Sequence, residues 1–295
     1  MAGAWFAAVE ARRQEALALE TVTSFESNLT TVEERFRQGL SPALDVRLTR
    51  ANVASARATH SQRRRQADLA VRQLEVLLGR YPAGSLESDE WLVDLPVDVP
   101  AGLPADLLER RPDIRASAQR LVSADASLIE SRRALLPAIR LTGSYGRASS
   151  ELENLLEDPF DVWSLVGNIT APVFQGGRLR ANVDRSEARR EEALANFRDI
   201  TLTAFREVES ALAGESYLRD QLDAVRSSAS ESIGAQELAE ERYERGLVDI
   251  ITVLESQRRA FTSRSAVLSV QNQLLQNRIQ LYLSLGGDFA SEPRD

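Results

Sequence analysis

The 295-residue chain has no cysteine, one methionine and one histidine. Without cysteine it can form no disulfide, thiol nucleophile or cysteine-ligated metal site. Because His60 is the only histidine, the chain has neither a histidine metal cluster nor a catalytic triad. Its acidic residues are spread along helical segments beside arginines and offer no clustered acid–base pair. The sequence therefore predicts no enzymatic activity, no metal and no cofactor.

Long apolar runs and blocks of positive charge are also missing. No stretch of 18 or more apolar residues occurs, so the sequence predicts no transmembrane helix. The formal net charge is −8, and the one short basic run, Arg63-Arg64-Arg65, is typical of a solvated helix face. Nucleic acid is therefore not an expected partner. The first residues have neither a basic segment nor a long apolar one, so no signal peptide is visible.

A duplication organises the chain. The segment EERYERGLVDI at 240–250 repeats EERFRQGLSPA at 33–43 at an offset of 207 residues, which also relates Gly79 to Gly286. Each copy reads as a charged helix, a glycine where a helix C-cap favours a left-handed residue, a short turn and a returning helix. Two antiparallel helical hairpins are predicted, an arrangement that an ordinary helical bundle would share.

The helical pattern covers most of the chain. It predicts helices at residues 2–38, 44–78, 112–136, 178–245 and 250–285, with a short helical piece at 105–111. At 1.5 Å per residue, the segment 178–245 would be on the order of 100 Å long, which is more than a globular core of this chain length can cover. We therefore expect this helix to project into solvent or to pack against other subunits.

Two segments, 138–147 and 163–174, change to the alternating period of a strand. One face collects Ile139, Leu141, Tyr145, Trp163, Leu165 and Ile169, and the other collects Arg140, Thr142, Ser144, Asn168 and Thr170. Each segment has about the length that a tilted strand needs to cross a bilayer, with aromatic residues near its ends. A two-stranded ribbon over a helical core would look the same. Pro172 is expected near a strand end, because proline removes a ladder hydrogen bond.

Four motifs follow one another in a recognisable order. They are Leu107-Leu108-Glu109-Arg110-Arg111-Pro112-Asp113-Ile114, Ala134-Leu135-Leu136-Pro137, Pro172-Val173-Phe174-Gln175-Gly176-Gly177-Arg178, and the Arg242-Tyr243 turn that closes at Gly246. Together they resemble the TolC-like outer membrane factor family, the NodT-type outer-membrane efflux proteins of tripartite resistance-nodulation-division (RND) pumps. The resemblance extends over essentially the whole chain.

The resemblance implies a fold that is mainly α with a small β part. It implies long antiparallel helical hairpins, as in an α-barrel protomer, plus two transmembrane-type β-strands, in a duplicated efflux-protein architecture. Members of the family assemble as homotrimers, each chain giving four strands to a shared transmembrane sheet of twelve. The implied function is passive export of small molecules, including drugs in multidrug resistance, through a conduit in the Gram-negative outer membrane with a periplasmic helical part. The implied partners are a periplasmic adaptor, or membrane fusion, protein, an inner-membrane RND transporter and outer-membrane lipid.

The domain organisation follows from the same comparison. We expect a first-repeat hairpin at 1–80, a connector at 81–104, a second repeat at 105–287 and a C-terminal tail at 288–295. By the repeat offset, Met1 corresponds to Val208, so the first-repeat counterparts of 112–207 are missing, together with the signal peptide and lipidated cysteine of this lipoprotein family. We therefore expect an N-terminally truncated member, whose three copies bring six strands instead of twelve.

The resemblance also implies roles for three sets of residues. The hairpin tips that meet the adaptor would be Gly39, Leu40, Ser41, Gly246, Leu247 and Val248. A gate beside the second turn would use Tyr243 and Glu255, with Arg242 and with Glu244 where the family often has arginine. The polar strand residues Arg140, Thr142, Ser144, Asn168 and Thr170 would face the lumen, and Ile139, Leu141, Ile169 and Val173 would face lipid. Ordinary charge pairing on a helix surface is the plainer interpretation of the gate charges.

The main alternative is a soluble periplasmic coiled-coil scaffold or an adaptor-like protein. The adaptors of such pumps carry one hairpin flanked by lipoyl-like β modules, whereas this sequence predicts two hairpins flanking two strands. A scaffold would need no bilayer-length strands and no aromatic residues at their ends.

Overall fold

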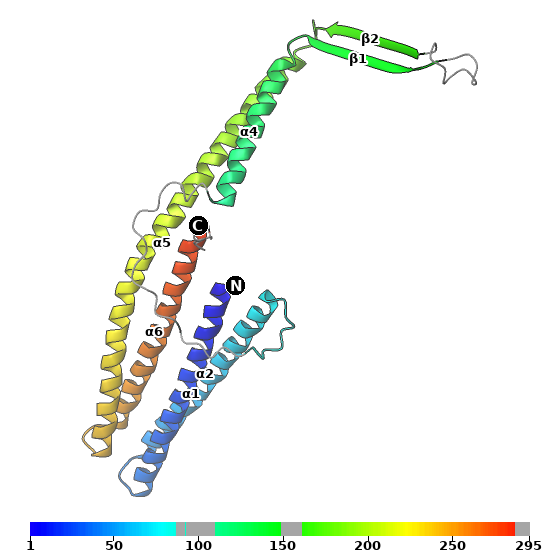
Figure 1. The fold of residues 1–295 in the computed structure, drawn as a ribbon. Coiled ribbons are helices and arrows are strands. Elements are labelled where there is room, and N and C mark those ends of the chain that lie inside the picture. The colour runs from blue at the N-terminus through cyan, green and yellow to red at the C-terminus, as the bar shows by residue number, and fades with distance from the viewer. Residues whose placement is uncertain (87–91, 93–109, 149–160, 287–295) are drawn as a thin grey trace, which may run out of the picture. The chain divides into compact units, whose positions relative to one another are not determined.

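Long helices dominate the computed structural model, which describes residues 1–86, 92, 110–148 and 161–286 (Figure 1). In chain order the elements are α1 (Ala2–Arg37), α2 (Ala43–Leu77), α4 (Pro112–Arg133), β1 (Ala138–Arg147), β2 (Asp161–Thr170), α5 (Arg178–Glu244) and α6 (Ile250–Ser284). The predicted fold class, mainly α with a small β part, is confirmed. Most of the predicted connector, nearly all of the 105–111 piece and the tail lie outside the described residues. Of the helices described, none is long and apolar enough to cross a membrane.

Two compact units make up the chain. One combines Met1–Leu103 with Arg206–Asp295 and holds both hairpins, α1 with α2 and the C-terminal part of α5 with α6. The other is Pro104–Phe205, with α4, the two strands and the beginning of α5. We call the first the hairpin unit and the second the strand unit.

The duplication extends to backbone detail in the hairpin unit. Shifting α1 by 207 residues puts its end at Glu244, where α5 ends, and shifting α2 reproduces both bounds of α6. Gly39 and Gly246, at the two tips, share a φ of 74°. In each tip the residue after this glycine donates its N–H to the carbonyl five residues back, as in a Schellman motif. Glycine is required here because a Cβ disfavours this left-handed conformation.

Burial in the hairpin unit occurs in small clusters along the helices. One of them lies at the tips and joins both hairpins through Val32, Val46, Ala239, Tyr243, Ile250, Val253 and Leu254. Further along, α1 lies beside α6 (Figure 1). There Ser265 Oγ donates to Gln14 Oε1 over 2.7 Å. Small and polar residues let these helices approach without a continuous apolar core.

In the strand unit, β1 and β2 form an antiparallel ribbon whose register runs from Ala138 opposite Thr170 to Arg147 opposite Asp161. The predicted second strand, 163–174, was wrong at both ends. It begins at Asp161, whose carboxylate accepts a 2.8 Å hydrogen bond from Arg147, and ends before Pro172, which has no N–H for the ladder. Val173 was predicted to face lipid from this strand, but it lies beyond the strand's end.

Candidate functional site: the hairpin tips and the strand ribbon

The two tips present a matched pair of apolar side chains. Leu40 is 62% exposed and Leu247, its repeat equivalent, is 69% exposed, while Gly39 and Gly246 beside them are exposed as well. Ser41 is instead buried and Val248 is half-buried. Of the six predicted tip residues, four therefore lie at the surface, and Ser41 and Val248 face the packed interior below it.

Tyr243 connects the two hairpins. Its side chain is only 6% exposed, and its hydroxyl lies 3.4 Å from Ser41 Oγ in the first hairpin. Arg35, at the end of α1, places its guanidinium 4.9 Å from the centroid of the Tyr243 ring. Its Nη1 donates to the carbonyl oxygens of Tyr243, over 3.4 Å, and Glu244, over 3.3 Å. A cation thus meets the negative end of the α5 dipole.

Tyr243 was among the gate residues predicted beside the second turn, but Arg35 was not. The signal was present, because Arg35 and Arg242 occupy equivalent positions in the two repeats. Only the packing distinguishes them, since Arg35 reaches across to the other hairpin whereas Arg242 is exposed.

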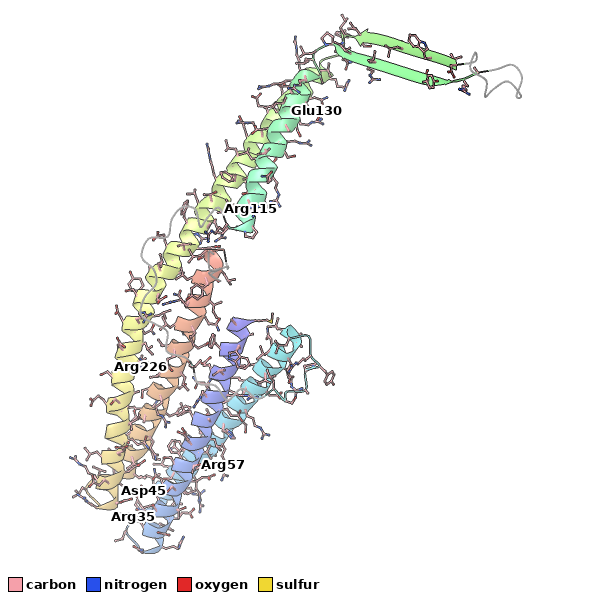
Figure 2. All side chains as sticks on the ribbon, in the orientation of Figure 1. Arg35, Asp45, Arg57, Arg115, Glu130 and Arg226 are labelled. Carbon is pink, nitrogen blue, oxygen red and sulfur yellow. The ribbon has the colours of Figure 1, made fainter. Side chains whose placement is uncertain are left out.

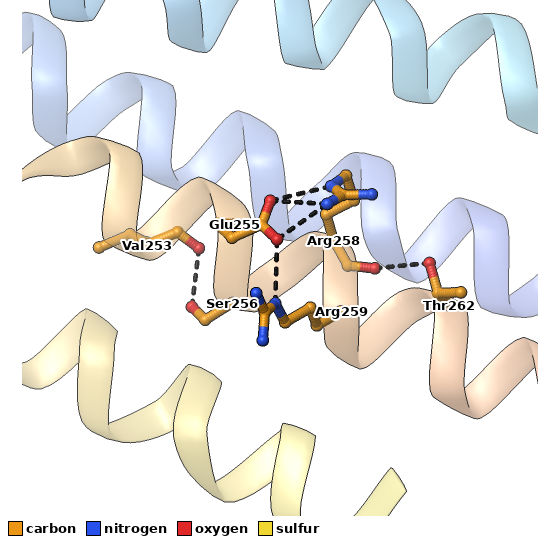
Figure 3. A network of polar contacts seen from close by, with 6 residues as sticks. All are labelled: Val253, Glu255, Ser256, Arg258, Arg259 and Thr262. Atoms are coloured by element: carbon orange, nitrogen blue, oxygen red, sulfur yellow. Dashed lines mark hydrogen bonds and ion pairs between the residues drawn. The ribbon is translucent and has the colours of Figure 1, made fainter. Parts of the chain in front are cut away.

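Glu255 lies on α6 and forms a charge network with its own helix (Figure 3). Its Oε1 lies 2.8 Å from Arg258 Nη2 and 2.9 Å from Arg259 Nε. The hydrogen bonds from Arg259 and then Arg258 hold the pKa of this carboxyl below its ordinary value. Among the residues that the structure describes, no hydrogen bond or ion pair joins Glu255 to Tyr243, and Arg242 and Glu244 lie exposed. The predicted gate residues thus form no single contact network within one chain.

Two further acids lie near the tips. Asp249 caps α6, and its Oδ1 accepts hydrogen bonds from the backbone N–H of Thr252, over 2.9 Å, and from its hydroxyl, over 2.7 Å. These bonds lower the pKa of Asp249. Asp45, which lies at the start of α2 (Figure 2), behaves in the opposite way, because burial and then the charge of Asp249 raise its pKa. The negative charge of Asp249 at the second tip therefore disfavours ionisation of Asp45 at the first.

The ribbon separates its polar and apolar side chains by face. Directly opposed residues of an antiparallel pair share a face, and the register places Arg140 opposite Asn168 and Ser144 opposite Ser164. The predicted polar residues Arg140, Thr142, Ser144, Asn168 and Thr170 therefore lie together, with Val162 and Val166 among them. Ile139, Leu141, Tyr145, Trp163, Leu165 and Ile169 share the other face. All of these side chains are exposed in the single chain.

A buried ion pair joins α5 to α6 away from the tips. Glu215 is 4% and Arg278 3% exposed, and Arg278 Nε donates to Glu215 Oε2 over 2.8 Å. Arg219 adds a second guanidinium at 2.8 Å. Burial raises the pKa of Glu215, but the hydrogen bonds from Arg278 and Arg219 outweigh it and hold this pKa below its ordinary value.

A second buried carboxylate, Glu75, holds the start of the connector. It accepts the backbone N–H groups of Gly84 over 2.7 Å, Ser85 over 2.9 Å and Leu86 over 3.0 Å. The hydrogen bond from Gly84, followed by the other two, lowers the pKa of Glu75 against the effect of burial. Neither this carboxylate nor the Glu215 pair was predicted from the sequence.

Comparison with known proteins decides which family these features belong to. The family model described as outer membrane efflux protein matches residues 1–80 and 103–287. The chain belongs to the outer membrane efflux protein family. The solvent efflux pump outer membrane protein SrpC of Pseudomonas putida is 36% identical over 271 residues, 92% of this chain and 58% of that protein. Outer membrane protein OprJ of Pseudomonas aeruginosa is 36% identical over 279 residues, 94% of this chain and 58% of OprJ.

Solved structures of similar proteins agree with this membership. A membrane protein from Pseudomonas aeruginosa, 35% identical, superposes with a TM-score of 0.86 over 96% of this chain and 66% of that one. CusC, 30% identical, superposes with a TM-score of 0.87 over 97% of this chain and 67% of its own. The chain thus spans 58% of the length of the named efflux-pump relatives. The expected family and its duplicated helical architecture are confirmed.

Proposed function

We propose that this chain is part of the outer-membrane channel of a tripartite efflux system and exports small molecules passively. The observation that carries the proposal is the register of the ribbon. It gives two ten-residue strands with one mainly apolar face and one mainly polar face, as a wall between lipid and water requires. The similarity to SrpC, an efflux-pump outer membrane protein, and to OprJ, an outer membrane protein, supports the same conclusion.

The proposed assembly is a homotrimer in the outer membrane of a Gram-negative cell, with the helical part in the periplasm. Leu40 and Leu247 would form the rim that meets a periplasmic adaptor protein, because both are large apolar side chains left exposed at a tip. An inner-membrane RND transporter would supply the energy, so the chain itself would need no reaction centre and would not be an enzyme. The apolar ribbon face would contact outer-membrane lipid.

We also propose that the second tip forms the gate, with Tyr243 as its fixed part and Glu255, Arg242 and Glu244 as its charged rim. The burial of Tyr243 between Ser41 and Arg35 supports the fixed role. In a planar bilayer, Glu255→Lys should change the ion conductance of the closed channel, because it reverses a charge beside Arg258 and Arg259. An unchanged conductance would remove Glu255 from the gate.

The function is tested on the two ribbon faces. Leu141 and Thr142 are neighbours on opposite faces, and the chain has no native cysteine. In outer-membrane vesicles, Thr142→Cys should react readily with a charged, water-soluble maleimide, while Leu141→Cys should react slowly and quench a lipid-borne fluorophore when labelled. Equal reactivity of the two thiols would contradict a membrane-spanning ribbon and favour the soluble scaffold.

A further inference from the structure

A groove on the hairpin unit runs over α1, α2 and α6, where α1 packs against both of the other helices (Figure 1). Its volume is about 220 Å³. Ala18 and Phe25 of α1 and Ala56 of α2 are buried along it, and Phe261 of α6 is half-buried. We call it the three-helix groove. The buried part of its lining is therefore apolar, and two phenylalanine rings border it.

Threonines from all three helices also line the groove, but their hydroxyl hydrogens are already used. Thr21, Thr59 and Thr262 each donate to the carbonyl oxygen four residues earlier in their own helix, over 2.8, 3.0 and 2.8 Å. Figure 3 shows this bond for Thr262. A hydroxyl has one hydrogen to donate, so these threonines offer a ligand only methyl groups and acceptor oxygens. A hydrogen-bond donor for the ligand must come from another side chain.

Among the described residues that line the groove, Arg258 is the only ionisable one. Its Nε lies 3.0 Å and its Nη2 lies 2.8 Å from Glu255 Oε2, so this edge of the guanidinium faces a carboxylate (Figure 3). Within the part of the chain that the structure describes, no hydrogen bond involves Nη1 of Arg258. A guanidinium has five N–H donors in a planar fork. The edge formed by Nη1 and Nη2 can therefore receive a second carboxylate.

We propose that the three-helix groove binds a small aromatic carboxylate. The carboxylate lies on the open edge of Arg258, and the ring contacts Phe25 and Phe261 in edge-to-face or offset geometry. The volume agrees with this ligand, because a cavity of about 150 Å³ holds benzene and the groove has room for one ring with a carboxylate. The site is additional to the proposed export function, and it lies within one chain.

Neither an inorganic anion nor a neutral aromatic molecule matches the whole lining. Sulfate or phosphate can pair with Arg258, but it would lose water against the apolar surface of Ala18 and Ala56 without a compensating bond. A neutral ring can cover that surface but gives the open guanidinium edge no acceptor. A molecule that has both a ring and a carboxylate satisfies both parts of the lining.

Glu255 modulates the strength of this site. Its carboxylate shares the guanidinium of Arg258 with the ligand, so the two negative charges repel one another and compete for Nη2. Removing the charge of Glu255 while keeping the shape of its side chain should therefore tighten binding.

Fluorine NMR of small probes tests the site in the full purified chain, with the same buffer and detergent without protein as the blank. The probe is 4-fluorobenzoate. Two matched probes each lack one part of it: 4-fluorobenzyl alcohol has the ring without the carboxylate, and trifluoroacetate has the carboxylate without the ring. We expect one saturable site per chain for 4-fluorobenzoate, with a dissociation constant of about 1 mM or lower. The other two probes should bind about tenfold more weakly or worse.

The two arginines that share Glu255 provide a matched pair of variants. Arg258→Gln should weaken 4-fluorobenzoate binding about tenfold. Arg259→Gln should leave it unchanged, because Arg259 contacts the same carboxylate at 2.9 Å but does not line the groove. Glu255→Gln should strengthen binding severalfold. Thr262→Phe adds a ring at the exposed rim of the groove and should abolish binding. Far-ultraviolet circular dichroism checks that each variant keeps its helices.

The proposal is overturned if 4-fluorobenzoate shows no saturable binding at millimolar concentrations, or if the alcohol binds as tightly as the carboxylate. Equal losses in Arg258→Gln and Arg259→Gln would assign the effect to the general charge of α6 and overturn the role of the open edge, as would weaker binding in Glu255→Gln. Unchanged binding in Thr262→Phe would place the ligand outside the groove. None of these outcomes bears on the export function, which the thiol labelling of the ribbon tests separately.

Discussion

The two hairpins have matching helix ends at their tips but different interiors. In the first, Ala8 on α1 faces Val71 and Leu74 on α2 in an apolar cluster. In the second, the positions equivalent to Ala8 and Val71 hold Glu215 and Arg278, paired and almost completely buried. The same backbone therefore accepts a small apolar contact or an ion pair. A duplicated fold preserves helix ends and turns more strictly than it preserves the chemistry between its helices.

The buried carboxylates of the two hairpins also serve different neighbours. Glu215 on α5 is held by guanidinium groups, so it ties one long helix to the other. Glu75 on α2, whose repeat equivalent is Tyr282, is held by three backbone N–H groups of the following segment. In the second hairpin, Glu215 joins α5 to α6. In the first hairpin, Glu75 fixes the segment through which the chain leaves α2.

Breaking the ion pair should have the largest effect. Glu215→Ala leaves the buried Arg278 without its carboxylate, and such an uncompensated charge costs about 3–5 kcal/mol. We expect the urea midpoint of unfolding, followed by far-ultraviolet circular dichroism, to fall accordingly.

The control for this variant copies the first hairpin into the second. Glu215→Ala with Arg278→Val reproduces the Ala8–Val71 contact and removes both charges. Because replacing a whole buried pair by apolar residues is often neutral or stabilising, the double variant should recover most of the lost stability. A double variant as unstable as the single one would show that the second hairpin cannot use the apolar solution.

Lowering the pH tests the second difference, the role of Glu75 at the end of the first hairpin. The pKa of Glu75 is lowered in the folded chain. Its contribution to folding stability is therefore fully present above the pKa that glutamate has in the unfolded chain, about 4.3. That stability is lost as pH falls through the lower pKa of the folded chain. Glu75→Gln should raise amide hydrogen exchange at Gly84, Ser85 and Leu86 on the order of tenfold at pH 7, because the charged acceptor is gone. It should also remove the acid dependence of the protection factors at these three amides, that is, of exchange measured relative to the unfolded chain at the same pH.

The comparison control is Tyr282→Phe in the second hairpin, at the position equivalent to Glu75. It should leave exchange at residues 84–86 unchanged at every pH. If Glu75→Gln also changed nothing there, the carboxylate would not hold the connector.

The sequence predicted those features that depend on local chemistry. The turn glycines Gly39 and Gly246, both left-handed, and the alternation of the strands follow from residues close together in the chain. The predicted end of β2 was wrong because alternation continues past Pro172, while the hydrogen-bond ladder does not.

Contacts between helices distant in sequence were missed. The Glu215–Arg278 pair spans 63 residues, and its partners are chosen by the register of two helices, which single-helix periodicity does not report. A usable signal lay in the repeat itself, since charged residues stand at 215 and 278 where the other copy has alanine and valine.

A smaller effect separates the two equivalent arginines. Arg35→Ala removes weak hydrogen bonds to carbonyls and a contact with the Tyr243 ring, and should lower the free energy of unfolding by about 1 kcal/mol. Arg242→Ala removes no side-chain hydrogen bond or ion pair among the residues that the structure describes, and in the same urea titration it should leave the free energy of unfolding nearly unchanged. Equal losses of monomer stability would mean that Arg242 also has a partner within one chain.

The smallest effect should come from converting the second tip into the first. Tyr243→Phe places phenylalanine where the first repeat has Phe36, and leaves Ser41 without its partner 3.4 Å away. Because this bond is long, the loss should be about 0.5 kcal/mol in chemical unfolding. Adding Ser41→Val, which copies Val248, should restore the wild-type value, since neither hydroxyl then remains buried. A loss in the double variant as large as in the single one would locate the effect in packing around the ring and not in the hydroxyl pair.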